Sequence, residues 1–175
     1  ALTIADVDAW AKCVPNARID NLYGPTENTI YCTSYTYLRT TKNKVLNGVL
    51  SIGKAMEGTQ TLIINENRQT QKVGVKGELC LAGVQLTEGY WKNEEKNSEA
   101  FFDYQGTRYY RTGDICKMDN DGDINYCGRL DFQVKIQGYR IELGEIEHHA
   151  REFLNGTNAI CIPTKSTSGM TEIAL

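Results

Sequence analysis

The chain opens with apolar residues at helical spacing and continues in short stretches where apolar and polar residues alternate. The apolar face of a predicted amphipathic helix over residues 4–13 consists of Ile4, Val7, Trp10 and Ala11. Residues 17–23 predict a strand that runs into a Gly-Pro turn. Residues 29–38, rich in Thr and Tyr, predict a second strand. The start of the chain therefore combines one helix with two strands that flank a loop.

The middle of the chain, from Val49 to about Tyr126, is a series of short strands separated by turns. The clearest strands span residues 49–52, 59–64, 78–82, 109–110 and 115–118. Short strands at close spacing predict a small barrel or sandwich. Residues 93–102 predict a short helix anchored by Phe101 and Phe102, and residues 120–123 predict a hairpin turn.

The composition changes near residues 129–131, where we place a domain boundary. Apolar and polar residues then alternate on both sides of Gln137-Gly138, which predicts a two-stranded hairpin. A helix over residues 145–154, capped at Asn155-Gly156, and a buried strand over residues 159–162 follow. Hairpin, helix and strand in this order predict the start of a separate α+β lobe.

The fold class predicted from these elements is α+β, with one domain over residues 1–130 and another over residues 131–175. The chain starts without Met and ends at Ile173-Ala174-Leu175, an apolar run that resembles the opening of a strand. A strand that opens at the end of a sequence has no finished sheet to join. We therefore expect the chain to be a piece of a longer protein.

Composition is that of a soluble globular protein, since the 175 residues are 41% hydrophobic and 23% charged. The net charge of −3, with no basic block, argues against nucleic-acid binding, and no apolar run is long enough to span a membrane. The six cysteines form no Cys-x-x-Cys pair, so zinc spacing is absent. They predict buried free thiols in a reducing compartment, the cytoplasm. His148 and His149 point apart on a helix and do not converge on a metal.

Candidate chemistry lies in the loop Asn21-Leu22-Tyr23-Gly24-Pro25-Thr26-Glu27. Gly24 permits a close approach of the backbone to a ligand, and the proline after it fixes the turn. Thr26 can donate to a phosphate oxygen and Glu27 can ligate a hard cation such as Mg²⁺. The ring of Tyr23 is placed to stack on a base. An ordinary turn is the alternative, because a short motif of this kind often occurs by chance.

Two other polar groups invite a functional interpretation. Asp114 follows a Thr-Gly turn, and a carboxylate there can accept hydrogen bonds from the vicinal hydroxyls of a ribose. Arg129 can supply permanently charged donors to a sugar or phosphate. The plain alternatives are a capped turn for Asp114 and a surface ion pair with Asp131 for Arg129.

A calcium loop is a further possibility at Asp119, Asp121 and Asp123, but its spacing fails. The position that requires glycine is Ile124, and the position of the closing glutamate is Leu130. The hairpin turn is the better interpretation of this segment.

Four motifs, taken in order, resemble those of the adenylate-forming superfamily, which includes acyl-CoA synthetases, luciferases and amino-acid adenylation domains. They are Asn-x-Tyr-Gly-Pro-Thr-Glu, Gly77-Glu78-Leu79 with Gly89-Tyr90-Trp91, Tyr110-Arg111-Thr112-Gly113-Asp114, and the run from Gly128 to Glu147. The resemblance covers essentially the whole chain and favours the amino-acid branch, because of Gln133-Val134-Lys135-Ile136. Within that branch the chain is most similar to D-alanine–carrier protein ligases, which serve the D-alanylation of teichoic acids.

The resemblance implies that residues 1–130 are the end of the large adenylation domain, a strand–loop sheet edge with a small β-barrel. Residues 131–175 would then be the hinge and the beginning of the small C-terminal domain. The implied activity is that of an AMP-forming ligase that uses ATP and Mg²⁺. It activates an amino acid, D-alanine, as an aminoacyl-adenylate and transfers it to the phosphopantetheine thiol of a carrier protein.

Other functions stay open at this point. An adenylation domain of a peptide synthetase, or an acyl-CoA ligase, is the alternative within the class. A non-catalytic domain that retains the fold is the alternative from another class. The family's phosphate loop and its catalytic lysine have no counterpart in this sequence, so we expect the 175-residue chain alone to be inactive.

The resemblance also implies roles for individual residues. Those expected to be catalytic are Thr26, Glu27 and Arg129, with Glu27 as the magnesium ligand. Those expected to bind the nucleotide are Asn21, Leu22, Tyr23, Gly24, Pro25, Thr26, Asp114, Tyr126, Cys127, Gly128 and Arg129. Leu22, Ile30 and Tyr31 are expected to line the amino-acid pocket. Asp131 is expected to be the hinge, and Lys135 and Gly138 lie in a hairpin expected to move toward the site for thioester formation.

Overall fold

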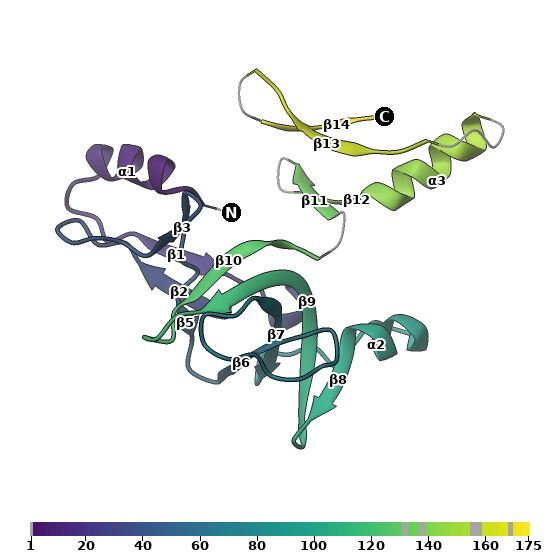
Figure 1. Cartoon of the computed structure of the whole chain (residues 1–175), viewed down its shortest axis with the longest axis horizontal. Coiled ribbons are helices and arrows are strands. Elements are labelled where there is room, and N and C mark those ends of the chain that lie inside the picture. Colours follow the sequence, from purple (N-terminus) through teal and green to yellow (C-terminus); the bar gives the residue numbers. More distant parts are fainter. Residues whose placement is uncertain (1, 131–132, 137–138, 155–158, 168–169) are drawn as a thin grey trace. The chain divides into compact units, whose positions relative to one another are not determined.

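The computed structural model describes residues 2–130, 133–136, 139–154, 159–167 and 170–175. The chain divides into two compact units, residues 1–130 and residues 131–175 (Figure 1). The identity of these units as the end of one large domain and the start of a smaller one stays a prediction.

The first unit begins with helix α1 (Ile4–Cys13), which confirms the predicted helix. The hydroxyl of Thr3 caps it by accepting a hydrogen bond from the backbone N–H of Asp6 at 3.2 Å. Val7 and Ala11 are buried in a small apolar cluster, while Trp10, which belongs to the predicted apolar face, is exposed.

A three-stranded antiparallel sheet follows, in the order β1 (Asp20–Tyr23), β2 (Thr33–Thr36) and β5 (Lys54–Ala55). Both predicted strands, 17–23 and 29–38, are shorter than expected. The second is shortened because Thr29 and Ile30, which follow the 3-10 helix η1 (Thr26–Asn28), have positive φ and interrupt the extended backbone. Strands β3 (Val45–Leu46) and β4 (Val49–Leu50) form a separate small hairpin.

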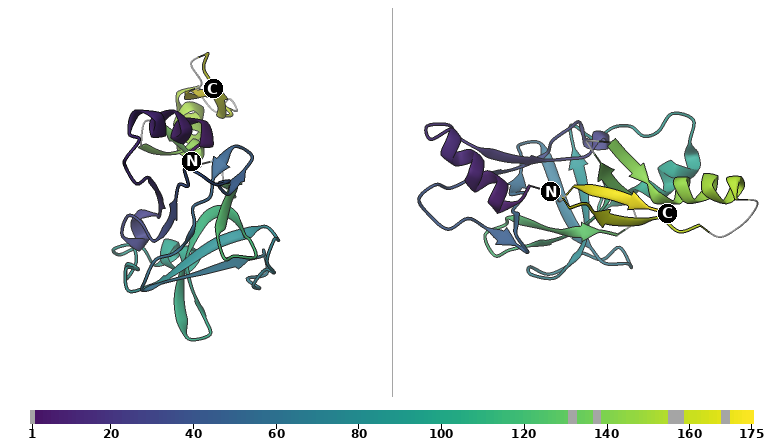
Figure 2. Two further views of the ribbon diagram at one scale, coloured as in Figure 1. Left: turned by 90° about the vertical axis from the view of Figure 1, so that its left-hand side faces the viewer. Right: turned by 90° about the horizontal axis from the view of Figure 1, so that it is seen from above.

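The rest of the first unit is a curled antiparallel sheet (Figures 1 and 2), which confirms the α+β fold class with many short strands. Its strands are β10 (Ile124–Arg129), β9 (Thr107–Met118), β7 (Gly77–Gly83) and β6 (Thr59–Ile64), with β8 (Phe101–Tyr104) paired to β9. Its apolar interior consists of the buried residues Cys32, Ile52, Ile63, Leu79, Leu81, Cys116 and Ile124.

The helix predicted over residues 93–102 is wrong at its end. Helix α2 (Glu94–Ala100) stops before the two phenylalanines, which begin β8 instead. Phe101 packs its ring 5.3 Å from that of Tyr110 in β9, and Phe102 packs 5.9 Å from Tyr109. Cross-strand aromatic pairs of this kind stabilise a sheet, and they override the weak helical pattern.

The two strands predicted around Asp114 are one continuous strand, β9, so the predicted Thr-Gly turn is wrong. Thr112 and Gly113 form a bulge inside the strand, where the pairing of β7 with β9 shifts register. Gly113 has a φ of 70°, which favours glycine.

The second unit contains the predicted hairpin, β11 (Gln133–Ile136) paired with β12 (Tyr139–Glu142), and helix α3 (Leu143–Phe153). The predicted turn at residues 137–138 and helix cap at residues 155–156 lie outside the described residues. The strand predicted over residues 159–162 is wrong in its position, since β13 spans Ile162–Lys165. The expectation that the last apolar run has no sheet to join is wrong, because β14 (Thr171–Ala174) pairs with β13.

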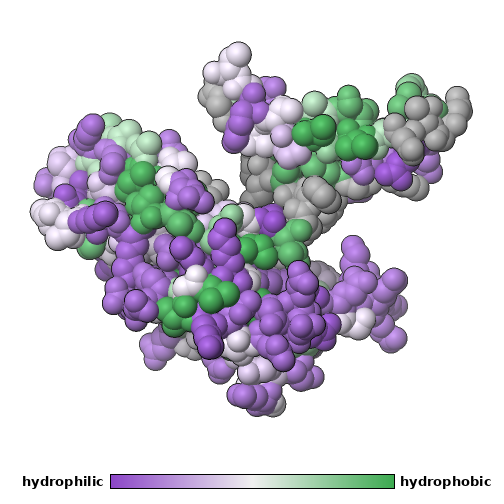
Figure 3. Space-filling model, in the orientation of Figure 1, coloured by the Kyte–Doolittle hydropathy of each residue, from purple (hydrophilic) through white to green (hydrophobic). Residues whose placement is uncertain are grey.

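Four of the six cysteines, Cys32, Cys80, Cys116 and Cys161, are buried free thiols as predicted, whereas Cys13 is exposed. Figure 3 shows hydrophilic residues over much of the visible surface, with apolar patches between them. Among the described residues, no helix combines the length and the apolar character needed to cross a membrane.

Candidate functional site

The loop after β1 folds back on its own backbone. The N–H of Cys32 donates to the carbonyl oxygen of Tyr23 at 2.8 Å and closes the loop. A Cβ atom on Gly24 would lie 2.6 Å from the Cα of Tyr31, a contact too short to exist. The packing of the loop against itself therefore requires a glycine here, for a reason that the sequence does not show.

Asp114 lies directly after the bulge in β9. Its N–H donates to the Thr112 hydroxyl at 3.0 Å, and that hydroxyl donates to the carbonyl oxygen of Leu79 in β7 at 2.7 Å. Bulges of this kind change the direction in which a strand side chain points. The bulge thereby brings the Asp114 carboxylate to the end of β1.

Two residues that are distant in sequence, Tyr23 and Arg129, meet at this carboxylate. The Tyr23 hydroxyl donates to Oδ2 of Asp114, and Nη1 of Arg129 donates to Oδ1 at 2.9 Å. Burial and the neighbouring carboxylate raise the pKa of Tyr23 well above its ordinary value, so the phenol remains a hydrogen-bond donor. Each carboxylate oxygen can accept more than one hydrogen bond, so Asp114 retains capacity for two hydroxyls of a ligand.

The register of β10 places Arg129 opposite Asp114. The pairing of β10 with β9 shifts between Tyr126 and Gly128, so that one additional residue, Cys127, is accommodated. Gly128 takes a φ of 137° at this bulge. Arg129 pairs with Asp114 rather than only lying on the surface, while Asp131, its expected alternative partner and the expected hinge, lies outside the described residues.

Glu27, which belongs to this loop, is buried. The Tyr90 hydroxyl donates to Oε1 of Glu27 at 2.6 Å, and the N–H of Thr87 donates to the Glu27 carbonyl oxygen at 2.9 Å. Burial, followed by the hydrogen bond to Glu27, raises the pKa of Tyr90, so this phenol also stays protonated. The segment around Gly89-Tyr90-Trp91 therefore fixes the orientation of the Glu27 carboxylate.

The Glu27 carboxylate is compatible with a magnesium ion that takes most of its ligands from elsewhere. In the part of the chain that the structure describes, no cluster of three or more His, Cys, Asp or Glu side chains is arranged to hold a metal ion. Glu27 offers one carboxylate, the hard oxygen ligand that Mg²⁺ prefers. Magnesium typically takes its other ligands from water and from the phosphates of a substrate.

The three residues expected at the amino-acid pocket, Leu22, Ile30 and Tyr31, are all exposed. The N–H of Tyr31 donates to the carbonyl oxygen of Thr29 at 3.0 Å and closes a three-residue turn around Ile30. Ile30 has a φ of 74°, which is unfavourable for a β-branched residue. Strained backbone of this kind is concentrated at functional sites, where the surrounding structure holds it.

The remaining predicted residues take different positions. The buried Asn21 amide donates to the carbonyl oxygen of Ser51 at 2.8 Å, so its side chain ties β1 to the segment after β4. Tyr126 packs against the core of the curled sheet, and Thr26 is exposed. Their nucleotide-binding roles stay predictions, as does the role of Cys127, which is half-buried. Gly138 and the side chain of Lys135 are outside what the structure describes.

Glu78 and Arg111 also join this site; both lie in motifs quoted above, but the sequence indicates no role for either residue. Oε1 of Glu78 accepts from the N–H of Gly113 at 3.0 Å, and Oε2 accepts from Nε of Arg111 at 2.9 Å. Both side chains line a cavity of about 350 Å³ in the first unit. The available signal was an acidic residue at the head of the apolar run Leu79-Cys80-Leu81-Ala82.

Comparison with known proteins identifies several relatives. Residues 1–91 match the family model described as AMP-binding enzyme. The chain is 42% identical over 161 residues to a linear gramicidin synthase protein of Brevibacillus parabrevis, an alignment that covers 90% of this chain and 3% of that protein. It is 40% identical over 153 residues to the D-alanine–D-alanyl carrier protein ligase of Lactiplantibacillus plantarum, which covers 87% of this chain and 30% of the ligase.

Solved structures share the fold. The Vibrio cholerae adenylation domain AlmE, crystallised with glycyl-adenosine-5′-phosphate, gives a TM-score of 0.86 at 34% identity over 98% of this chain and 32% of its own. PA1221, a nonribosomal peptide synthetase (NRPS) protein with adenylation and PCP domains, gives 0.81 at 29% identity over 98% of this chain and 35% of its own. The chain thus spans about a third or less of these relatives.

Proposed function

The chain belongs to the family of AMP-binding enzymes, and from this premise we propose that it is part of a ligase that activates an amino acid as an aminoacyl-adenylate. The observation that carries the proposal is the cluster of Tyr23, Asp114 and Arg129. A buried carboxylate, held by one phenol and one guanidinium and still able to accept hydrogen bonds, fits the vicinal hydroxyls of a ribose.

In this proposal each member of the cluster has a separate task. Asp114 accepts hydrogen bonds from the ribose, and Arg129 fixes one of its oxygens while compensating its charge in a buried place. The Tyr23 hydroxyl fixes the other oxygen. The ring of Tyr23 packs against the interior of the curled sheet but is only partly buried, and we propose that it stacks on the adenine base. These groups position the nucleotide, and positioning contributes much of the rate in reactions between two bound substrates.

Glu27 is the proposed ligand of a magnesium ion, because it is a buried carboxylate whose orientation Tyr90 fixes. When bound, the ion would offset the negative charge of the phosphates. The exposed hydroxyl of Thr26, one residue earlier in the same loop, is proposed to donate to the α-phosphate. The sugar and the phosphates would thus be held by two segments, β9 and the loop after β1.

The amino acid is proposed to bind beside Leu22, Ile30 and Tyr31, since the backbone at Ile30 holds an unfavourable conformation and all three side chains are exposed. D-alanine is the substrate we propose, with transfer to a carrier-protein phosphopantetheine thiol; the 40% identity to a D-alanine ligase supports it. A peptide-synthetase module for another amino acid is the second candidate, supported by the 42% identity to linear gramicidin synthase.

The test uses the protein expressed from its complete reading frame and measures ATP–pyrophosphate exchange with a panel of amino acids. We expect exchange that depends on D-alanine, and Asp114→Ala should raise the KM for ATP by about tenfold or more, because hydrogen bonds to a charged group are lost. Asp103→Ala is the matched control, since Asp103 is an exposed aspartate of β8. Exchange driven by another amino acid would select the second candidate.

Two results would count against the proposal. Absence of exchange with every amino acid, with AMP formed instead from a fatty acid and coenzyme A, would identify an acyl-CoA ligase. An unchanged KM for ATP in a folded Asp114→Ala protein would remove the ribose role of Asp114.

A further inference from the structure

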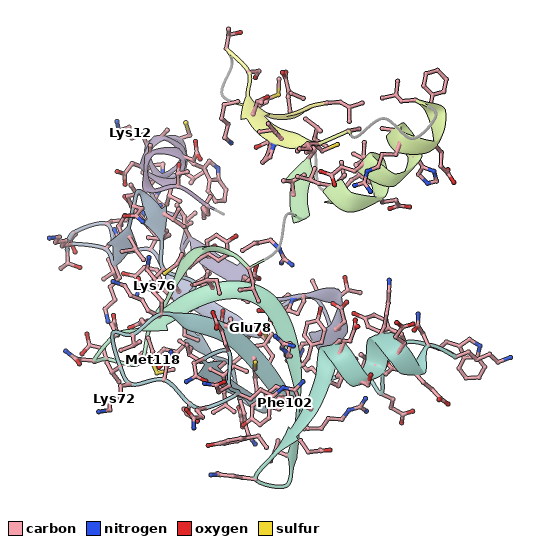
Figure 4. The ribbon with its side chains drawn as sticks, turned by 45° about the vertical axis from the view of Figure 1, so that its right-hand side comes forward. Lys12, Lys72, Lys76, Glu78, Phe102 and Met118 are labelled. Atoms are coloured by element: carbon pink, nitrogen blue, oxygen red, sulfur yellow. The ribbon has the colours of Figure 1, made fainter. Side chains whose placement is uncertain are left out.

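We propose that Glu78 is a positioning residue for the nucleotide: it holds the bulge of β9 in the shape that presents Asp114 to the ribose. The inference rests on the proposed function of Asp114. Glu78 lies in β7, and Figure 4 labels its side chain among the strands of the curled sheet. In this proposal Glu78 acts through the backbone of β9 and not by contact with the nucleotide.

The bulge leaves backbone groups of β9 without regular sheet partners. Cys80 of β7 pairs with Arg111 of β9, and Glu78 pairs with Ile115. Between these pairs β7 has one residue, Leu79, where β9 has the three residues 112–114. A ladder cannot satisfy three residues with one, so other groups must bind the polar atoms of the bulge.

Glu78 satisfies the polar atom at the centre of the bulge. Its Oε1 accepts the N–H of Gly113 at 3.0 Å, the residue whose positive φ forms the bulge. On the other side of the strand, the N–H of Leu130 donates to the Gly113 carbonyl oxygen at 2.7 Å. Gly113 is therefore held at both its N–H and its carbonyl oxygen, and Asp114 is the next residue along the chain.

An ion pair with Arg111 compensates the charge of this buried carboxylate. The Glu78 side chain is 8% exposed, and Arg111 donates to its Oε2 from Nε at 2.9 Å and approaches it with Nη2 at 2.7 Å. A paired arrangement of this kind is strong and directional. Burying a charge in an apolar strand is costly unless the charge is paired. The hydrogen bond from the Gly113 N–H to Glu78 explains why a glutamate occupies this position in β7.

Discrimination between ATP and its deoxy analogues tests this role, because Asp114 can accept hydrogen bonds from the ribose hydroxyls only when its carboxylate is correctly placed. In the protein from the complete reading frame, we measure the KM values for ATP, 2′-deoxy-ATP and 3′-deoxy-ATP in the exchange assay. Glu78→Ala should reduce the preference for ATP by about tenfold, toward the value of Asp114→Ala, and leave the KM for the amino acid unchanged.

Two further variants complete the experiment. Glu66→Gln is the control, because Glu66 is an exposed glutamate that lines the same cavity, and its preference for ATP should equal that of the wild type. If Glu78→Ala does not fold, Glu78→Gln replaces it as the test variant. The glutamine side chain keeps the shape of glutamate and one acceptor oxygen but loses the negative charge. The preference of this variant for ATP should fall by about threefold.

The outcomes separate the two proposals. If Asp114→Ala keeps the full preference for ATP, the ribose role of Asp114 is wrong and so is the inference built on it. If Asp114→Ala loses the preference while folded Glu78→Ala, or folded Glu78→Gln in its place, retains it, the function stands and the role of Glu78 is overturned. A loss that appears equally in Glu66→Gln would also overturn it.

Discussion

At the scale of single residues, Lys44 shows how one cation can organise a turn. Its ammonium lies 2.8, 2.7 and 2.6 Å from carboxylate oxygens of Asp119, Asp121 and Asp123 in the turn between β9 and β10. The N–H groups of Asp121 and Asp123 both donate to Oδ1 of Asp119 at 2.9 Å. The three aspartates, whose spacing resembles that of a calcium loop, therefore bind the ammonium group of Lys44.

Titration of this turn follows from its contacts. Burial raises the pKa of Asp119, but the Lys44 ammonium and the two backbone N–H groups outweigh burial and hold that pKa below its ordinary value. Hydrogen bonds to the three carboxylates raise the pKa of Lys44. An aspartate whose pKa is lowered in the folded state contributes stability above its unfolded pKa of about 3.9. That contribution is lost as the pH falls through the folded pKa.

We therefore expect Lys44→Met to lower the Tm by several degrees at pH 7, because three carboxylates are left close together without a counter-charge. The difference from the wild type should shrink as the pH falls below about 4, where Asp119 becomes protonated. Thermal unfolding followed by circular dichroism across this pH range measures it. Lys42→Met is the control, since Lys42 is exposed. A Tm difference that does not change with pH would contradict the electrostatic explanation.

How far the sequence predicts single residues depends on how local their contacts are. Tyr23, Asp114 and Arg129 could be nominated from their motifs, and the structure brings the three together. Glu78 and Tyr90 could not, although both lie in recognised motifs. Their contacts depend on the register between β7 and β9 and on the path of a loop, and neither is encoded in the residue pattern of one segment.

At the scale of elements, Gly53 joins the three-stranded sheet of the first unit to the curled sheet. The N–H of Ile124 in β10 donates to the Gly53 carbonyl oxygen at 2.7 Å, and the N–H of Ile52 donates to the Ile124 carbonyl oxygen at 3.0 Å. Gly53 has a φ of 77°, and a Cβ atom there would lie 1.7 Å from the carbonyl oxygen of Ser34 in β2. Both the conformation and the space therefore exclude a side chain.

Gly53→Ala should lower the free energy of unfolding by about 3–5 kcal/mol, because the clash is with backbone that cannot move without separating β2 from β5. Gly48→Ala is a matched control. Gly48 has a similar φ of 79° but no atom within 4 Å of the added Cβ, so only the conformational cost of about 1–2 kcal/mol remains. Urea unfolding of both variants measures the difference. Equal destabilisation would show that the contact with Ser34 is relieved at no cost.

The position of a helix or strand is predicted well where the local residue pattern determines it. It is predicted poorly where pairing with distant strands determines it. Helix α1 and the hairpin of β11 and β12 have clear periodicity, and both are found where the pattern places them. The end of α2 and the continuity of β9 depend on partners elsewhere in the sheet. Phe101 joins β8 because Tyr110 lies opposite, and a local pattern contains no information about that neighbour.

At the scale of the whole molecule, the described residues provide only part of what adenylation chemistry requires. The candidate site supplies two carboxylates, Asp114 and Glu27, and one guanidinium that already pairs with Asp114. Transfer at a phosphate needs positive charge directed at the phosphate oxygens. The solved relatives are about three times as long as the aligned part, which leaves most of their chain to provide such groups.

We therefore expect the 175-residue chain, expressed by itself, to show no amino-acid-dependent pyrophosphate exchange above a blank. The protein from the complete reading frame, assayed in parallel, should show exchange and should lose its preference for ATP over 2′-deoxy-ATP when Asp114 is replaced by alanine. Circular dichroism must show that the 175-residue chain is folded, so that inactivity cannot be due to unfolding. Turnover by the folded 175-residue chain would show that these residues, with Mg²⁺, stabilise the phosphate charge without help. The inference that the described residues form only part of the adenylation site would then be wrong.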